Sequence, residues 1–402
     1  MLSIYPSNPL LQLNKLQTGV KWVYNTIIYY MDQSDNTQNS TPPTLPSQAQ
    51  ATSASTSNNP ELAALYQKIQ SVKLPKELYE KAVVQLERMN LTLKYGGNIQ
   101  ALDTVTKYID WIISLPWFSE SNDILDIAYA QKVMNEGHYG LDEIKKRVLE
   151  YLAILISQKQ EDKLSSAHAP ILFFVGLAGT GKTTFAKSIA NALGRKFVRI
   201  AFGGLSSAYD LRGVSKVQPE AEPGLIIKGL QRAGTRNPVI LLDELDRIAE
   251  SAHGEIMGVL IELLDPQQND RFSDHYIDYP FDLSHAIFVA TANNTTNVAT
   301  AVIDRMEVIQ MPSYTDDDKT QIGKTYLLPK YLKDIGLTPD QVTIDDALWS
   351  DIVRPLGFEP GIRSLERIVE GMIRKAAYKI VSGQGTQFYI NKSNVKEFMR
   401  EL

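Results

Sequence analysis

The spacing of apolar residues along the chain changes near residue 170. From Pro60 to about residue 116 they recur at helical intervals, as in "PELAALYQKIQ" and "ALDTVTKYIDWIISLPWF", and predict a small helical bundle. From Pro170 onward, short apolar runs indicate buried strands: "PILFFVG", "KFVRIAF", "PVILLDE" and "HAIFVATANN". Helical stretches separate these runs. Strands that alternate with helices predict a doubly wound parallel sheet, so the expected fold class is α/β.

Two flanking regions complete the pattern. After about Tyr314 the apolar spacing is helical again, and "TQFYINKSNVKEFMREL" indicates a strand, a turn and a last helix. Residues 32–59 are rich in Ser, Thr, Gln, Asn and Pro, which predicts a flexible linker behind the aromatic segment "VKWVYNTIIYYM". The expected domains are therefore an aromatic head and linker at 1–59, a helical domain at 60–135, an α/β domain at 136–314 and a helical domain at 315–402.

Composition excludes several classes of function. The chain of 402 residues carries a formal net charge of −5, which argues against a large nucleic-acid surface. It contains no cysteine, so it offers neither a thiolate metal site nor a cysteine nucleophile. No apolar run reaches the roughly 20 residues of a membrane span, and the N-terminus lacks a signal-peptide pattern. We expect a cytoplasmic protein with no transmembrane segment and no nucleic-acid partner.

The stretch "GLAGTGKTTF" carries the most specific chemistry. It fits G-x-x-x-x-G-K-[ST] and stands between a predicted strand and a predicted helix, as a phosphate-binding loop requires. Its glycines let backbone N–H groups surround phosphate oxygens, and the helix N-terminus adds positive potential. The alternative is a glycine-rich turn without a ligand. The predicted nucleotide-binding residues are Gly176, Ala178, Gly179, Thr180, Gly181, Lys182, Thr183 and Thr184, with Lys182 on the β- and γ-phosphates and Thr183 on Mg²⁺.

Two acidic residues follow a second apolar strand. "VILLDELD" reaches Asp243 and Glu244 directly after its buried positions. An acid at the end of a buried strand is costly unless it has a role. Asp243 can hold the Mg²⁺ shell, and Glu244 can orient and polarise an attacking water. The alternative is that the pair caps the next helix.

Two further positions suit phosphate chemistry. The strand end "ATANN" offers the amides of Asn293 and Asn294 to a γ-phosphate or a water, although a turn asparagine gives the same pattern. In "AVIDRMEVI", Arg305 can stabilise transferred phosphate charge in its own subunit or a neighbouring one. The alternative is that Arg305 pairs with Asp304 or Glu307.

Taken together, these stretches resemble the ATPase module of the Lon proteases, within the AAA+ superfamily. The resemblance covers about residues 60–402 and includes "GHYGLDEIKKRVLEYLA", "GLAGTGKTTFAKSIANALGRKFVRIAFGG", "NPVILLDELDRI", "DRMEVIQMPSYTDDDK" and "GIRSLERIV". It implies a P-loop NTPase fold with an α-helical lid, ATP and Mg²⁺ as ligands, a protein substrate and a homo-oligomeric ring, usually a hexamer.

The resemblance also implies roles for individual residues. Lys182 and Thr183 act in the P-loop, and Asp243 and Glu244 are the Walker B pair. The remaining roles are Asn293 as the sensor-1 residue with Asn294 as an alternative, Arg305 as an arginine finger, Arg363 as the sensor-2 arginine, and His138, Tyr139 and Gly140 beside the adenine.

The chain departs from the family pattern in two places. Lon proteases continue into a peptidase domain with a Ser–Lys dyad, whereas this chain ends at Leu402, where that domain would begin. We therefore expect no peptidase site here, and a separate peptidase becomes a candidate partner. In the family, an aromatic and an aliphatic residue between "RG" and "PG" grip the polypeptide, but Gln218 and Pro219 occupy these positions here. The alternative is that another loop grips, such as "AESAHGE".

The sequence leaves three functions open. The first is a Lon-type ATPase that remodels, unfolds or translocates proteins without its own peptidase site, or that forms the ATPase part of a split or truncated Lon protease. The second is a nucleotide-switched scaffold whose N-terminal head recruits a partner. The third, a DNA-associated ATPase, is disfavoured by the acidic balance of the chain.

Overall fold

The computed structural model describes residues 60–95, 100–160, 171–356 and 359–399. The expected aromatic head and linker at 1–59 lie outside the described residues. Within the described part of the chain, no helix combines the length and the apolar character that a membrane span requires.

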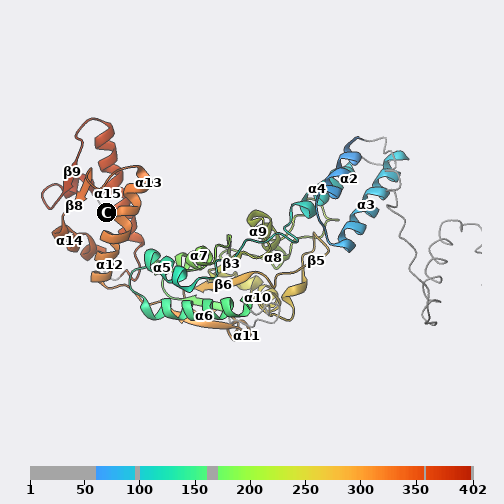
Figure 1. Ribbon diagram of the computed structural model, residues 1–402, viewed down its shortest axis with the longest axis horizontal. Helices are drawn as coiled ribbons and strands as arrows, with labels where there is room; N and C mark the ends of the chain where they lie inside the picture. The colour runs from blue at the N-terminus through green and yellow to red at the C-terminus, as the bar shows by residue number, and fades with distance from the viewer. Residues whose placement is uncertain (1–59, 96–99, 161–170, 357–358, 400–402) are drawn as a thin grey trace, which may run out of the picture. The chain divides into compact units, whose positions relative to one another are not determined.

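Five parallel strands form one sheet in the order β2–β3–β6–β1–β7. Figure 1 labels β3 and β6 of this sheet. The strands are β1 (Ile171–Val175), β2 (Phe197–Ala201), β3 (Val239–Asp243), β6 (Ile287–Ala292) and β7 (Met306–Gln310). The predicted α/β class and its parallel sheet are confirmed. The fifth strand, β7, was not predicted, because "MEVIQ" mixes polar and apolar residues as an edge strand can. Parallel strands bring all their carboxyl ends to one edge of the sheet.

Helices cover both faces of this sheet. Along β1, Leu172 and Phe174 pack with α5 (Ile127–Gly137), α6 (Asp142–Gln160) and α7 (Lys182–Leu193). Phe173 and Val175 point to the other face, which packs with α9 (Leu225–Ala233) and α10 (His253–Leu263). Because side chains alternate along a strand, an apolar run such as "ILFFV" is buried on both sides.

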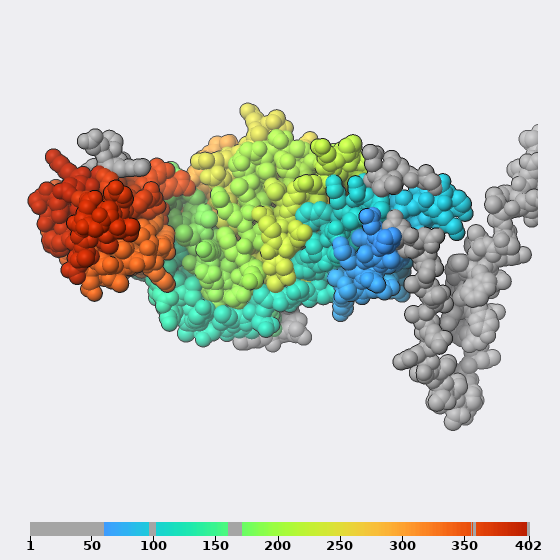
Figure 2. Space-filling model, turned by 90° about the horizontal axis from the view of Figure 1, so that it is seen from above, coloured from blue at the N-terminus to red at the C-terminus, as the bar shows by residue number. Residues whose placement is uncertain are grey.

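The region before the sheet is helical, as the sequence predicts. It contains α2 (Pro60–Ser71), α3 (Lys76–Lys94) and α4 (Gln100–Ser114). Its core is continuous with one face of the sheet domain, since Trp117 packs against Phe281 with ring centroids 5.0 Å apart. Figure 2 shows these helices in blue and cyan beside the yellow-green sheet domain.

The C-terminal region forms its own core around Trp349. Its helices are α12 (Asp316–Ile322), α13 (Leu328–Ile335), α14 (Trp349–Val353), α15 (Arg363–Val381) and α16 (Val395–Phe398), with a π-helical turn at Gly323–Leu327. A Cβ at Gly323 would lie 2.3 Å from the Trp349 ring, so glycine is required where that turn meets the core. The predicted final strand and helix are confirmed as β9 (Phe388–Ile390) and α16, and β9 pairs with an unpredicted strand, β8 (Val342–Ile344).

Short elements connect these larger ones. They are α8 (Tyr209–Arg212), α11 (Thr300–Ile303), β4 (Phe272–Ser273) and β5 (Pro280–Phe281), with 3₁₀ turns at Leu245–Arg247, Glu250–Ala252, Asn269–Arg271, Asp346–Leu348 and Arg354–Leu356.

Candidate nucleotide-binding site

The predicted phosphate loop joins β1 to the N-terminus of α7. Gly179 and Gly181 have φ angles of +83° and +96°, which side chains with a Cβ rarely adopt. The Thr180 hydroxyl donates to the Leu177 carbonyl at 2.9 Å and closes the loop on itself. Thr183 is exposed on the first turn of α7. The loop therefore presents its backbone N–H groups and the helix N-terminus to one side, as anion binding requires.

Lys182 is buried at the start of α7 and points back into the loop. Its ammonium donates to the carbonyls of Gly176 at 2.5 Å and Leu177 at 3.0 Å, and to Asn293 Oδ1 at 3.2 Å. Burial lowers the pKa of Lys182, and the nearby carboxylates, with Asp246 the strongest, oppose that shift. All three acceptors are neutral oxygens. A buried cation in a glycine-rich cradle with only neutral acceptors fits the phosphates of a nucleotide.

Asp243 lies at the carboxyl end of β3 and is 3% exposed. Its carboxylate joins the two neighbouring strands: Arg199 Nε on β2 lies 2.6 Å from Oδ2, and the Thr291 hydroxyl on β6 donates to Oδ1. Sequence analysis did not find Arg199 or Thr291. The available signal was a polar residue within each apolar strand, in "FVRIA" and "IFVATA".

Glu244 adopts a left-handed backbone, with φ of +62° and ψ of +50°. Such a conformation costs a non-glycine residue about 1–2 kcal/mol and is typical of functional sites. Its N–H donates to Thr291 Oγ1 at 3.1 Å, and its carboxylate lies 3.4 Å from Arg247 Nη1. The Glu244 side chain makes no capping bond to the following 3₁₀ turn, so the capping alternative is wrong for this residue.

The structure separates the two asparagines after β6. Asn293 donates from Nδ2 to Asp246 Oδ2 at 3.1 Å while its Oδ1 accepts from Lys182. Asn294 Oδ1 instead accepts the Thr296 N–H at 3.1 Å, which forms a local turn. Asn293 is therefore the amide that faces the phosphate loop. Asp246, the third acid of "DELD", was missed by the sequence analysis.

The segment before α15 lies directly on the phosphate loop. The Ile362 N–H donates to the Gly179 carbonyl at 3.2 Å, and a Cβ at Gly361 would lie 2.5 Å from the Ala178 carbonyl oxygen. Arg363 is the first residue of α15, and a Cβ at Gly179 would lie 3.2 Å from its Cγ. The structure therefore brings Arg363 to the loop, as the resemblance implies.

Arg305 lies at the opposite edge of the sheet. β1 and β7 pair in parallel from Ile171–Met306 to Val175–Gln310, so Arg305 precedes β7 where the phosphate loop follows β1. Five strand residues span roughly 16 Å, which an arginine side chain cannot bridge. Arg305 Nη1 donates to the Ala301 carbonyl at 2.6 Å, and Nη2 lies 3.6 Å from Asp265 Oδ2. The alternative pairing with Asp304 or Glu307 is therefore wrong.

The three residues expected beside the adenine lie between α5 and α6. His138 is 5% exposed, its ring stacks on Phe185 at 3.7 Å between centroids, and its Nε2 lies 3.0 Å from Ser188 Oγ. Burial lowers the pKa of His138 to about 4. The imidazole is thus part of the interior behind α7. Tyr139 is half-buried and Gly140 has φ of +57°, so these two remain on the outer side of that turn.

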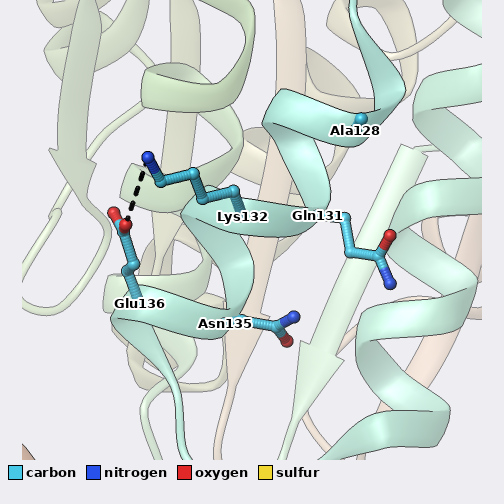
Figure 3. Close-up of a pocket in the computed structure, with 5 residues that line it drawn as sticks. All are labelled: Ala128, Gln131, Lys132, Asn135 and Glu136. Atoms are coloured by element: carbon cyan, nitrogen blue, oxygen red, sulfur yellow. Dashed lines mark ion pairs between the residues drawn. The ribbon is translucent and has the colours of Figure 1, made fainter.

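A nearby pocket contains none of the predicted site residues. It has a volume of about 450 Å³ on α5 and is lined by Ala128, Gln131, Lys132, Asn135 and Glu136 (Figure 3). Lys132 and Glu136 form an exposed ion pair at 3.8 Å across one helical turn. Such a pair is typical of a solvated helix face and indicates no chemistry.

Two family models match this chain. The model described as "ATPase family associated with various cellular activities (AAA)" matches residues 172–314, and the model described as "Lon protease AAA+ ATPase lid domain" matches residues 333–388.

Curated relatives agree with these matches. A Lon protease of Heliobacterium modesticaldum is 42% identical over 335 residues, which cover 83% of this chain and 40% of the relative. Lon protease 1 of Bacillus subtilis is 40% identical over 339 residues, which cover 84% of this chain and 43% of the relative. The chain thus spans about two fifths of the length of the curated relatives it matches. It belongs to the Lon family, of which it carries the AAA+ ATPase domain and the lid domain.

Proposed function

We propose that this chain hydrolyses ATP and uses the energy to remodel, unfold or translocate protein substrates. The observation that carries the proposal is the convergence of Lys182, Asn293 and Arg363 on one glycine-rich loop, with Asp243 and Glu244 at the end of the adjoining strand β3. Phosphoryl transfer depends on positioning and charge stabilisation, and these groups supply both.

Each side chain receives a role from its position. Lys182 holds the β- and γ-phosphates, and Arg363 adds positive charge from the lid side of the loop. Glu244 orients and polarises the attacking water, while Asn293 positions Lys182 and the water. The described residues contain no cluster of three or more His, Asp or Glu side chains that could hold a metal alone. Thr183 and, through water, Asp243 would hold Mg²⁺ beside the substrate's phosphates, where the ion would supply neutralising charge.

The adenine and the ring assembly belong to the same proposal. The turn at 138–140 borders the adenine, with Tyr139 and Gly140 on its outer side. Arg305 cannot reach the loop of its own chain, so it completes the site of a second copy in a homo-oligomeric ring, usually a hexamer. Its distance from the loop along β1 and β7 supports this assignment.

The loop at 214–222 is the proposed contact with a polypeptide. Gln218, Pro219 and Glu220 are exposed at its tip, as is Val217, whose side chain is 85% exposed. Val217 provides apolar surface that could contact a polypeptide. The sequence analysis had placed only Gln218 and Pro219 at the gripping positions. The polar Gln218 favours the second candidate, a nucleotide-switched scaffold. Deletion of residues 1–59 would abolish partner binding by a scaffold but leave ATP turnover of a motor intact.

ATP turnover of the purified full chain tests the proposal. Turnover is measured with and without unfolded casein, while the assembly is sized on a column in parallel. We expect turnover from a ring-sized species that rises with casein. ATP turnover that does not change with casein would favour the nucleotide-switched scaffold. No ATP turnover at all would contradict the proposed ATPase activity.

A further inference from the structure

The loop between α8 and α9 has a closed base. The Val214 N–H donates to the Glu222 carbonyl at 3.1 Å, so the two legs pair with each other. Two glycines let the two ends of the loop pack closely. A Cβ at Gly213 would lie 2.7 Å from Gly224 N, and a Cβ at Gly224 would lie 2.0 Å from the Leu211 carbonyl oxygen. No other residue type fits at Gly224 without moving the backbone. The loop therefore leaves the domain through a tightly packed base, although its tip is exposed.

One buried carboxylate holds that base. Asp274 follows β4 and is 1% exposed. Its Oδ2 accepts the Gly224 N–H at 2.8 Å, and its Oδ1 accepts the N–H groups of Tyr276 at 2.9 Å and Ile277 at 3.0 Å. The N–H of the next residue, His275, donates to the Arg212 carbonyl at 2.7 Å. The turn that begins at Asp274 thus binds both legs of the loop.

The carboxylate is satisfied by backbone donors. Burial raises the pKa of Asp274, and the three N–H groups oppose that shift. A buried acid held by backbone N–H groups alone is costly compared with an apolar residue, so its place at this base suggests a task. An asparagine of the same shape would turn an N–H donor toward one of these three donors.

A second contact ties the first leg to the same turn. Lys216 Nζ lies 4.2 Å from the centre of the Tyr108 ring on α4 and 3.6 Å from Asp278 Oδ2. The Tyr108 hydroxyl donates to the Ile277 carbonyl at 3.2 Å. The loop base, the turn and the helical region before the sheet therefore form one connected unit.

We propose that Asp274 is the positioning residue of the loop at 213–224: it holds the loop's base through Gly224 N–H, so that the tip at 217–220 meets a polypeptide in one orientation. The inference rests on the proposed function, because it assigns the loop to polypeptide contact. Asp274 touches neither nucleotide nor polypeptide and acts through the loop.

A single spin label reports the state of the loop. The chain contains no cysteine, so Val217→Cys provides one attachment site for a nitroxide. We expect Asp274→Asn to increase the mobility of this label. In the unlabelled Asp274→Asn variant, the casein concentration for half-maximal stimulation of ATP turnover should rise about tenfold, as the loss of a charged hydrogen bond predicts, while the maximal stimulated rate changes much less.

Asp282→Asn is the matched control. Asp282 also accepts a backbone N–H in a turn, from Ser284 at 2.9 Å, but the loop base is held by Asp274 instead. This variant should keep the wild-type label mobility and casein dependence. An Asp274→Asn protein with lower thermal stability but unchanged label mobility and casein dependence would overturn the proposal and leave Asp274 a purely structural residue.

A measurement on the wild type covers the case in which Asp274→Asn does not fold. Hydrogen exchange of the Gly224 amide should be slow while the amides of the tip at 217–220 exchange fast; fast exchange at Gly224 overturns the proposal. If casein does not stimulate the wild type, the proposed function fails. The label mobility and the exchange rate still test whether Asp274 holds the loop base in that case, because neither measurement needs a substrate.

Discussion

The two edges of the parallel sheet differ in how their charged groups are held. At the carboxyl edge, Lys182 contacts Asn293, and Asn293 contacts Asp246, so that one loop, one turn and one strand end are joined. At the amino edge, Arg305 is about one third exposed, donates to the Ala301 carbonyl at 2.6 Å and lies 3.6 Å from the Asp265 carboxylate. The charged groups of the first edge are held by contacts within one chain. The second offers a partly exposed cation whose acidic partner lies 3.6 Å away, and the proposed function places this cation at a second copy of the chain.

The difference shows which part of the chemistry one chain can supply. Nucleotide binding and water activation need groups that are fixed relative to the phosphate loop, and the proposed function assigns these steps to the carboxyl edge. β1 and β7 separate Arg305 from its own loop, so in the proposed function its charge acts in a second chain. We expect the following changes to affect the two edges differently.

The largest effect is expected at the carboxyl edge, from Glu244→Gln. The amide keeps the shape but cannot polarise water, so turnover should fall by up to about 10⁴-fold while ATP binding persists. Radiolabelled ATP hydrolysis and equilibrium ATP binding measure the two quantities. Glu250→Gln, a nearby exposed acid, is the control and should behave as wild type. Wild-type turnover of Glu244→Gln would refute the role of this residue.

At the amino edge, Arg305→Ala should lower turnover about 10³-fold, since a transition-state arginine acts on transferred phosphate charge. Affinity for ATP should change little. The control is Asp265→Asn, which removes the charge that faces Arg305 but keeps an oxygen that can accept the Gln267 N–H, and which should leave turnover within about twofold. Equal losses in both variants would mean that Arg305 serves the fold, and the contrast between the two edges would disappear.

A smaller effect is expected from the support of Asp243. Arg199→Met removes the guanidinium 2.6 Å from this carboxylate, so the Mg²⁺ concentration for half-maximal turnover should rise about tenfold. A titration of turnover with Mg²⁺ measures this. Arg271→Met, at an 83% exposed arginine, is the control. An unchanged Mg²⁺ dependence of Arg199→Met would show that Thr291 alone orients Asp243.

The smallest effect concerns stability rather than rate. Burial lowers the pKa of His138 to about 4, so the unfolded chain binds more protons than the folded chain between pH 6.5 and 4. Stability from the neutral imidazole is complete above pH 6.5 and is lost as pH falls toward 4. From pH 6.5 to 5.5 the loss should be about 1 kcal/mol.

Denaturant unfolding at several pH values checks this loss against His138→Phe, which keeps the ring stack on Phe185. The pKa of His285 is also lowered by burial, but that group titrates in both proteins and cancels in the comparison. Identical pH dependence of the two proteins would place the His138 ring in contact with solvent, on the nucleotide side.

The sequence predicted the features that depend on neighbouring residues. The phosphate loop, the acids after β3 and four of the five strands follow from local patterns, because each apolar run and its ending are contiguous in the chain. The family resemblance added Arg363, which no local pattern connects to the loop.

The remaining features depend on strand register and tertiary contact. Arg199 and Thr291 meet Asp243 only because β2 and β6 flank β3 in the sheet. Asp265 lies far from Arg305 in the sequence, so the sequence offered only the nearer acids Asp304 and Glu307 as alternative partners. The strand β7 lacks a continuous apolar run because, as an edge strand, it is only partly buried.

Mixing two inactive variants tests the central claim most directly. Glu244→Gln keeps Arg305, and Arg305→Ala keeps Glu244, so a mixed assembly contains complete sites between unlike chains. We predict that ATP turnover of the mixture exceeds the sum of the two separate activities once subunit exchange is verified with labelled chains. Turnover that never exceeds that sum, despite verified exchange, would contradict a site completed by Arg305 of a second copy.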